Sequence, residues 1–184
     1  MATNKTFEDI VVEIRGILTR AELILEEIPP PQKLAPFAFA MTADTSDESA
    51  TARFVLLHDP AGQEGWAGAY RCVTFVRANV DNEMASDPMV ANVGWSWLIE
   101  GLEKFGCNYV QPSGTVTRVA SSSFGALGER EDDSEIEVRA SWTPTDSNSV
   151  ADHARAWLEL LERCAGLEPI PDGVTPLSRN NLAQ

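Results

Sequence analysis

Residues 135–142 alternate strictly between apolar and polar side chains over their whole length. A period of two residues predicts a β-strand with one buried face and one face in solvent. The longest β-type run, residues 70–80, follows an apolar run at residues 53–58 after a turn-forming segment that contains Pro60 and Gly62. These two runs are expected to pair as an antiparallel hairpin. We therefore expect a sheet that keeps one face open to solvent.

Three further segments carry apolar side chains at helical three-and-four spacing, at residues 6–20, 87–105 and 149–165. Thr6 and Asp9 form a capping-box pattern at the start of the first segment. Its end is ambiguous, because the helical spacing continues to Ile28, whereas residues 23–28 before three prolines equally fit a short extended segment. The first helix is predicted to end near Arg20.

The order of these elements predicts one α+β domain with a mainly antiparallel, five- to six-stranded sheet and three helices. The elements follow as helix, strand meander, helix, two strands and helix, and their connections are too short for most parallel crossovers. Further strands are expected at residues 36–41 and 109–120. The domain is expected to span residues 6–167, after a flexible N-terminus at residues 1–5 and before a tail at residues 168–184 that is strapped over the surface or disordered.

The chain is strongly acidic, with 28 Asp and Glu residues against 14 Lys and Arg residues among 184, and its formal net charge is -14 at pH 7. This charge opposes binding to nucleic-acid phosphates and to anionic lipid surfaces. No apolar run approaches the roughly 20 residues that a membrane-spanning helix needs. We therefore expect a cytoplasmic protein that binds neither nucleic acid nor membrane.

The residues that most often carry metal or nucleophilic chemistry are few and scattered along the chain. Cys72, Cys107 and Cys164 form no C-x-x-C pair and are odd in number, as expected of reduced thiols at core positions. His58 and His153 do not stand at the short separations from these cysteines that hold a zinc ion, and no spacing pairs either with a cysteine nucleophile. The sequence therefore predicts no metal site, no cofactor and no catalytic residue.

Arginine dominates the basic residues, with 11 arginines among the 14. Arg71 and Arg77 are six residues apart on one predicted strand and share a face, and Arg139 lies on the solvent face of another strand. Because a guanidinium group pairs with a carboxylate through two parallel hydrogen bonds, these arginines would suit a carboxylate ligand or an acidic partner segment. The alternative is that Glu135 and Glu137 engage them in ordinary ion pairs on an exposed sheet.

Trp95 and Trp97 are two residues apart in the second predicted helix, so their side chains point in nearly opposite directions. Trp97 is assigned to the core. Trp95 has two interpretations. It is either an exposed anchor at a ligand or partner site, or a second core residue that reaches beneath the loop at Pro88.

Five motifs that follow one another along the chain carry a resemblance to a known family. They are PQKLAP at 31–36, LLHDP at 56–60, VGWSWL at 93–98, SGTVT at 113–117 and RASWT at 139–143. Over about Phe7 to Leu167 the chain resembles an uncharacterised actinobacterial family named as domain of unknown function number three thousand. The resemblance implies a bacterial cytoplasmic protein, and it brings no assigned reaction, cofactor or catalytic residue.

Two functions fit these observations. The first is a non-catalytic protein-interaction or adaptor module that uses the open sheet face or a helix edge, with a protein partner or a second copy in a homodimer. The second is a small-molecule (carboxylate) binding protein or enzyme with an arginine-lined pocket between the sheet and the second helix. In it Arg71, Arg77 or Arg139 would hold the carboxylate and Trp95 would form the wall. The first is preferred, because the sequence holds no recognisable catalytic, metal or phosphate-binding constellation.

Overall fold

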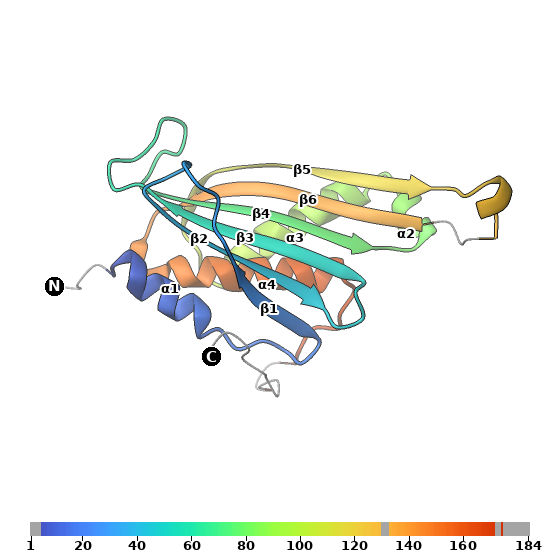
Figure 1. Ribbon diagram of the computed structural model, residues 1–184, viewed down its shortest axis with the longest axis horizontal. Coiled ribbons are helices and arrows are strands. Elements are labelled where there is room, and N and C mark those ends of the chain that lie inside the picture. The colour runs from blue at the N-terminus through green and yellow to red at the C-terminus, as the bar shows by residue number, and fades with distance from the viewer. Residues whose placement is uncertain (1–4, 130–132, 172–173, 175–184) are drawn as a thin grey trace.

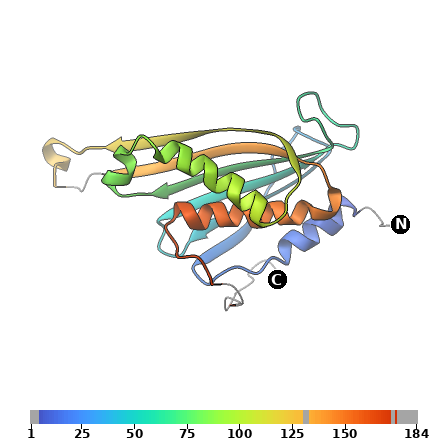
Figure 2. The same ribbon diagram turned by 180° about the vertical axis from the view of Figure 1, so that it is seen from behind.

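The computed structural model describes residues 5–129, 133–171 and 174. They form one six-stranded antiparallel sheet with its helices on one face (Figures 1 and 2). The strands are β1 (Leu23–Ile28), β2 (Phe37–Thr45), β3 (Ala50–His58), β4 (Tyr70–Asn79), β5 (Tyr109–Ser121) and β6 (Asp133–Pro144). The helices are α1 (Phe7–Arg15), α2 (Asn82–Ser86), α3 (Val90–Lys104) and α4 (Val150–Cys164). The expected α+β class and element order are confirmed, and α2 is an additional short helix that the periodicity did not predict.

The strands follow the order β1-β2-β3-β4-β6-β5, and every neighbouring pair runs antiparallel. The predicted hairpin is confirmed as β3 paired with β4, with Leu56 opposite Cys72. Trp142 of β6 continues this row on the other side of β4. All three side chains are fully buried, so this row faces the helices. β1 and β5 are the two edges of the sheet.

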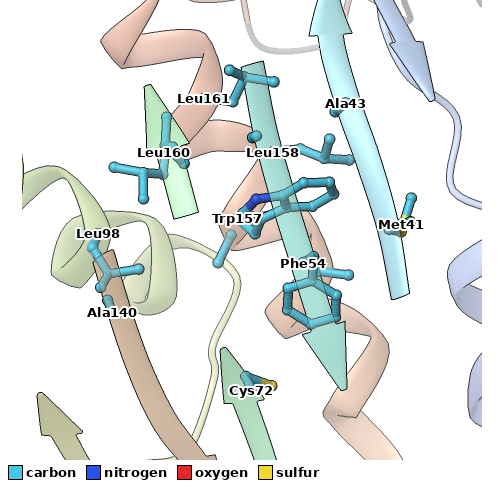
Figure 3. Close-up of a cluster of buried hydrophobic side chains, with 14 of the residues drawn as sticks. Met41, Ala43, Phe54, Cys72, Leu98, Ala140, Trp157, Leu158, Leu160 and Leu161 are labelled. Carbon is cyan, nitrogen blue, oxygen red and sulfur yellow. The ribbon is translucent and has the colours of Figure 1, made fainter. Parts of the chain in front are cut away.

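The helix-covered face carries the hydrophobic core (Figure 3). The ring centroid of Trp157 on α4 lies 5.4 Å from that of Phe54 on β3, and both side chains are fully buried. Leu98 of α3 and Leu161 of α4 belong to the same core and are also fully buried. Each side chain of this size contributes roughly 1.5–3 kcal/mol when buried. α4, predicted at residues 149–165, contacts β3, β4 and β6 and so covers the centre of the sheet.

The first helix is shorter than predicted. α1 starts with the predicted capping box but ends at Arg15, where Gly16 forms its C-cap, and does not continue to Arg20. The chain from Leu23 is extended instead, because β1 gains backbone hydrogen bonds with β2 and buries Leu23 and Leu25 against the core. Of the two interpretations of this segment, the extended one is correct.

Both ends of the domain are bonded to its body where the structure describes them. Lys5 Nζ donates to the carboxylate of Glu13 and, at 2.7 Å, to the carbonyl oxygen of Asn148. Arg20 Nη1 donates to the carbonyl oxygen of Glu168 at 2.8 Å. Most of the expected flexible N-terminus and of the expected C-terminal tail, at residues 1–4, 172–173 and 175–184, lies outside the described residues.

Candidate functional site

The centre of the helix-free face carries two arginines on either side of an aromatic ring. Arg53 of β3 is opposite Phe75 of β4, and Phe75 is opposite Arg139 of β6. The guanidinium carbon of Arg139 lies 5.2 Å from the centroid of the Phe75 ring, within the range of a cation–π contact. Arg77 stands two residues further along β4 and therefore points to the same face. Three strands thus bring three arginines to the part of this face that surrounds one phenylalanine.

These residues line an open depression with a volume of about 620 Å³. Arg53, Arg77 and Arg139 contribute the basic part of its lining, and Val55, Val73 and Phe75 the largest apolar part. Among the described residues no Asp or Glu lines it. We call this the arginine depression. In a chain of net charge -14 it is a local basic site with an apolar floor.

Two of the three arginines form ion pairs at the margin of the depression. Arg77 Nε lies 3.7 Å from Glu135, and Arg139 Nη2 lies 3.4 Å from Glu137. Both distances exceed the roughly 2.7–2.9 Å of a charge-assisted hydrogen bond, and the arginine side chains remain 49% and 65% exposed. Exposed pairs of this kind contribute about 0–1 kcal/mol. The ion pairs expected as the alternative are present, and they leave guanidinium N–H groups open to a ligand.

Arg53 is the residue that sequence reasoning missed. Its side chain is exposed, and it forms no ion pair or hydrogen bond with any residue that the structure describes. The run from Arg53 to His58 is apolar at its centre, so the sequence predicts for Arg53 only the start of a buried strand. The signal that would have found it is its two-residue spacing from Val55, which also lies on the helix-free face.

Arg71 lies on the same face, but its donors are used within the fold. Its guanidinium donates to Ser141 Oγ at 2.6 Å, to Thr143 Oγ1 and the carbonyl oxygen of Gln111 at 3.1 Å, and to Ser113 Oγ at 3.2 Å. Of the two β5 acceptors, Gln111 lies within the bulge in the β5–β6 pairing and Ser113 is the first paired residue after it. Desolvation by burial lowers the pKa of Arg71. Arg71 therefore holds β4, β6 and the β5 bulge together.

One end of the helix-free face is covered by two loops. A small apolar cluster forms there around Ala40, Val55 and Leu57, with Ala35 and Trp66 packed against it. The loop after β3 is joined to the proline-rich segment before β2, because Gln63 Nε2 donates to the carbonyl oxygen of Leu34 at 2.8 Å. The loops therefore close off one end of the face, and the arginine depression lies beside them.

Trp95 lies on the opposite side of the sheet from the arginines. It is half-buried on α3 and packs against the core, and a Cβ atom built on Gly114 of β5 would lie only 2.9 Å from its Cζ3 atom. Trp97 is also partly buried against the core. The prediction that Trp95 forms the wall of an arginine pocket between the sheet and the second helix is wrong, because the whole thickness of the sheet separates Trp95 from Arg77 and Arg139.

The comparisons with known proteins identify a family without an assigned activity. The model of a family described as protein of unknown function (DUF3000) matches residues 3–175. The chain belongs to this family. No curated protein and no solved structure matches the chain. Within the described part of this DUF3000 member, no helix is long and apolar enough to cross a membrane.

The interior of this DUF3000 member holds titratable groups in uncharged form. Burial lowers the pKa of His153 to about 4, and its Nδ1 accepts a hydrogen bond from Trp142 Nε1 at 2.9 Å. Burial also raises the pKa of Cys107 and Cys164 to about 12, and that of Cys72 well above its usual range. Within residues 5–129, 133–171 and 174, no group of three His, Cys, Asp or Glu side chains could hold a metal ion.

Proposed function

We propose that this chain is a non-catalytic protein-interaction or adaptor module that binds an acidic segment of a partner protein on its helix-free face. The observation that carries the proposal is the arginine depression, where Arg53, Arg77 and Arg139 surround Phe75 without a carboxylate in the lining. The matching partner has carboxylates on either side of an apolar side chain. Guanidinium groups would hold the carboxylates, and Phe75 would contact the apolar residue.

The net charge of the chain adds selectivity to this surface. A molecule of charge -14 repels acidic segments from most of its surface, so an acidic segment that binds is directed to the local basic site. Arg53 contributes most directly, because it forms no ion pair with a described residue that a partner would have to break. Arg77 and Arg139 would exchange weak contacts with Glu135 and Glu137 for shorter contacts with the partner.

We further propose the bacterial, actinobacterial cytoplasm as the location. The three cysteines are free and buried, which fits a reducing compartment. The motif resemblance supports the same assignment.

A second candidate function is supported by the size of the depression. Its volume of about 620 Å³ falls within the roughly 300–1,000 Å³ of small-molecule pockets, and a small carboxylate could occupy it alone. The open shape and the position on a sheet face favour the peptide, because a small ligand needs most of its surface buried.

The first prediction tests the binding face with a fluorescein-labelled peptide in which glutamates flank one phenylalanine. We expect fluorescence polarisation to show saturable binding that weakens with added salt. Arg53→Ser combined with Arg139→Ser should weaken it at least about 10-fold, because two charge-assisted contacts are lost. Arg155→Ser on α4, a half-exposed arginine on the helix-covered side, is the control and should bind as the wild type does.

The proposal is wrong if the peptide does not bind, or if the double variant binds it equally well. A peptide with lysines in place of the glutamates should not bind. Free benzoate and succinate test the second candidate. Displacement of the peptide by either one at micromolar concentration would favour a small-molecule site over a peptide site.

A further inference from the structure

β5 is an edge strand whose outer side carries no strand among the described residues. It runs for 13 residues, from Tyr109 to Ser121, along one margin of the sheet (Figure 1), and most of its side chains are exposed. An edge strand presents unpaired backbone N–H and C=O groups, which form a template for another strand. Soluble proteins usually protect such an edge with charges, prolines or a covering element.

The other edge of the sheet has this protection along its whole length, whereas β5 has it mainly at its start, where Pro112 and the bulge lie. β1 is only six residues long and carries Glu26 and Glu27. From Gly114 to Ser121, β5 contains no proline, lysine or carboxylate. Its one charged residue there is Arg118, and the guanidinium of Arg118 turns under the sheet to the carbonyl oxygens of Ala85 and Asp87.

The charge distribution favours a second copy of this chain as the partner for this edge. Two molecules of charge -14 repel each other over most of their surfaces. β5 has no carboxylate along its whole length, so it is an edge at which two copies can approach with little repulsion. A strand also pairs with its own copy in antiparallel fashion about a two-fold axis, which makes the interface self-complementary.

We propose that two copies of this chain pair through their β5 strands about a two-fold axis normal to the sheet. The two six-stranded sheets then become one continuous sheet with the helices of both copies on the same side. On the open side, Ser113, Thr115 and Thr117 of the two strands face each other as a row of hydroxyl groups. On the other side lies α3, which packs under β5 and leaves Val93 36% exposed.

This pairing goes beyond the proposed binding function and does not depend on it. It has one consequence for that function, because both arginine depressions would lie on the same face of the joined sheet. A partner with two acidic segments could then occupy both and gain affinity through avidity. Dimerisation and peptide binding are measured separately, so the failure of one leaves the other standing.

The second prediction is that the wild-type protein is a dimer in solution. Light scattering coupled to size exclusion tests it at about 100 µM chain, where a dimer of micromolar Kd is mostly assembled. We expect the wild type at twice the chain mass of 20.1 kDa. Thr115→Lys combined with Thr117→Lys places like charges at the interface and should give a monomer. The matched control is Ile24→Lys with Glu26→Lys on the open side of β1, which should remain a dimer.

Circular dichroism of the three proteins checks that each is folded, and amide hydrogen exchange gives a second measurement on the wild type. Alternate backbone amides between Gly114 and Ser121 point outward and should exchange slowly in the dimer. They should exchange rapidly in the Thr115→Lys/Thr117→Lys variant. A monomeric wild type, a dimeric β5 variant, or rapid exchange of these amides in a wild-type dimer would each overturn the proposal.

Discussion

The arginines of the helix-free face differ in what surrounds each guanidinium group. Arg71 donates four hydrogen bonds to neutral oxygens and holds β4 to β6 and β5. Arg77 and Arg139 make long contacts with carboxylates, and Arg53 makes no contact of this kind with a described residue. Availability for a ligand therefore rises from Arg71 to Arg53, although the residue type is the same.

A second residue of interest is His153, which is fully buried in the core. Burial lowers its pKa from 6.5 to about 4, because desolvation disfavours the charged imidazolium. Between these two pH values the unfolded chain binds a proton that the folded chain does not. The stability associated with a neutral His153 is therefore complete above pH 6.5 and decreases as the pH falls toward 4.

The third prediction follows from this decrease in stability at low pH. Between pH 7 and pH 5, the free energy of unfolding should fall by about 2 kcal/mol more in the wild type than in His153→Leu. Urea denaturation at both pH values measures it. The variant also leaves the Trp142 N–H without its acceptor and lowers stability at every pH, so only the difference between the two pH values is compared. Equal pH dependence in the two proteins would contradict the low pKa.

At the scale of the elements, α3 approaches the sheet closely because glycines occupy the contact points. A Cβ atom on Gly94 of α3 would lie 3.1 Å from Cδ1 of Ile136 and 3.2 Å from Cγ1 of Val116. On β5, a Cβ atom on Gly114 would collide with the backbone oxygen of Arg139 as well as with the ring of Trp95. The position of Trp95 therefore depends on a glycine in a different element.

The fourth prediction concerns this contact. Gly114→Ala should lower the free energy of unfolding by about 1–3 kcal/mol, because backbone atoms have to move to admit the methyl group. The emission spectrum of tryptophan should change as well, since Trp95 is displaced. Gly16→Ala is the control, because its Cβ atom would meet nothing closer than 3.4 Å, and it should change stability by less than about 0.5 kcal/mol. A Gly114→Ala variant as stable as this control would show that the sheet adjusts without strain.

At the scale of the whole molecule, one face of the sheet carries the core and the other carries the polar chemistry. All three cysteines belong to the covered face, and their side chains are buried in the core. Since burial raises the pKa of each thiol, the reactive thiolate is scarce near neutral pH. Reaction of Cys72, Cys107 and Cys164 therefore requires opening of the core.

The fifth prediction is that an aromatic disulfide reagent at pH 8 labels none of these thiols rapidly in the native protein. All three should react within the mixing time in denaturant. In the native protein, the rate of cysteine labelling should equal the rate of unfolding, so it should not rise further with reagent concentration. Rapid labelling of one cysteine in the native state would identify a local opening and contradict a single closed core.

Local periodicity was enough to determine the class of this fold. The two-residue alternation of residues 135–142 and the helical spacing of residues 149–165 depend only on backbone geometry, which side-chain spacing along the chain reports directly. The same alternation predicted that Arg71 and Arg77 share a face and that Arg139 lies on a solvent face, and the structure places all three on the side of the sheet without helices. It failed for the end of α1, because the hydrogen bonds that make β1 extended come from β2.

Only the tertiary structure decided what those side chains touch. Arg71 meets Gln111 and Thr143, which lie 40 and 72 residues away in the chain, and the sheet order that joins them cannot be derived from spacing along one strand. The same applies to Arg53, which flanks Phe75 through strand register, and to Trp95, which the sheet separates from every arginine of the open face. Periodicity specifies the face to which a residue belongs, whereas its neighbours depend on how distant segments pair.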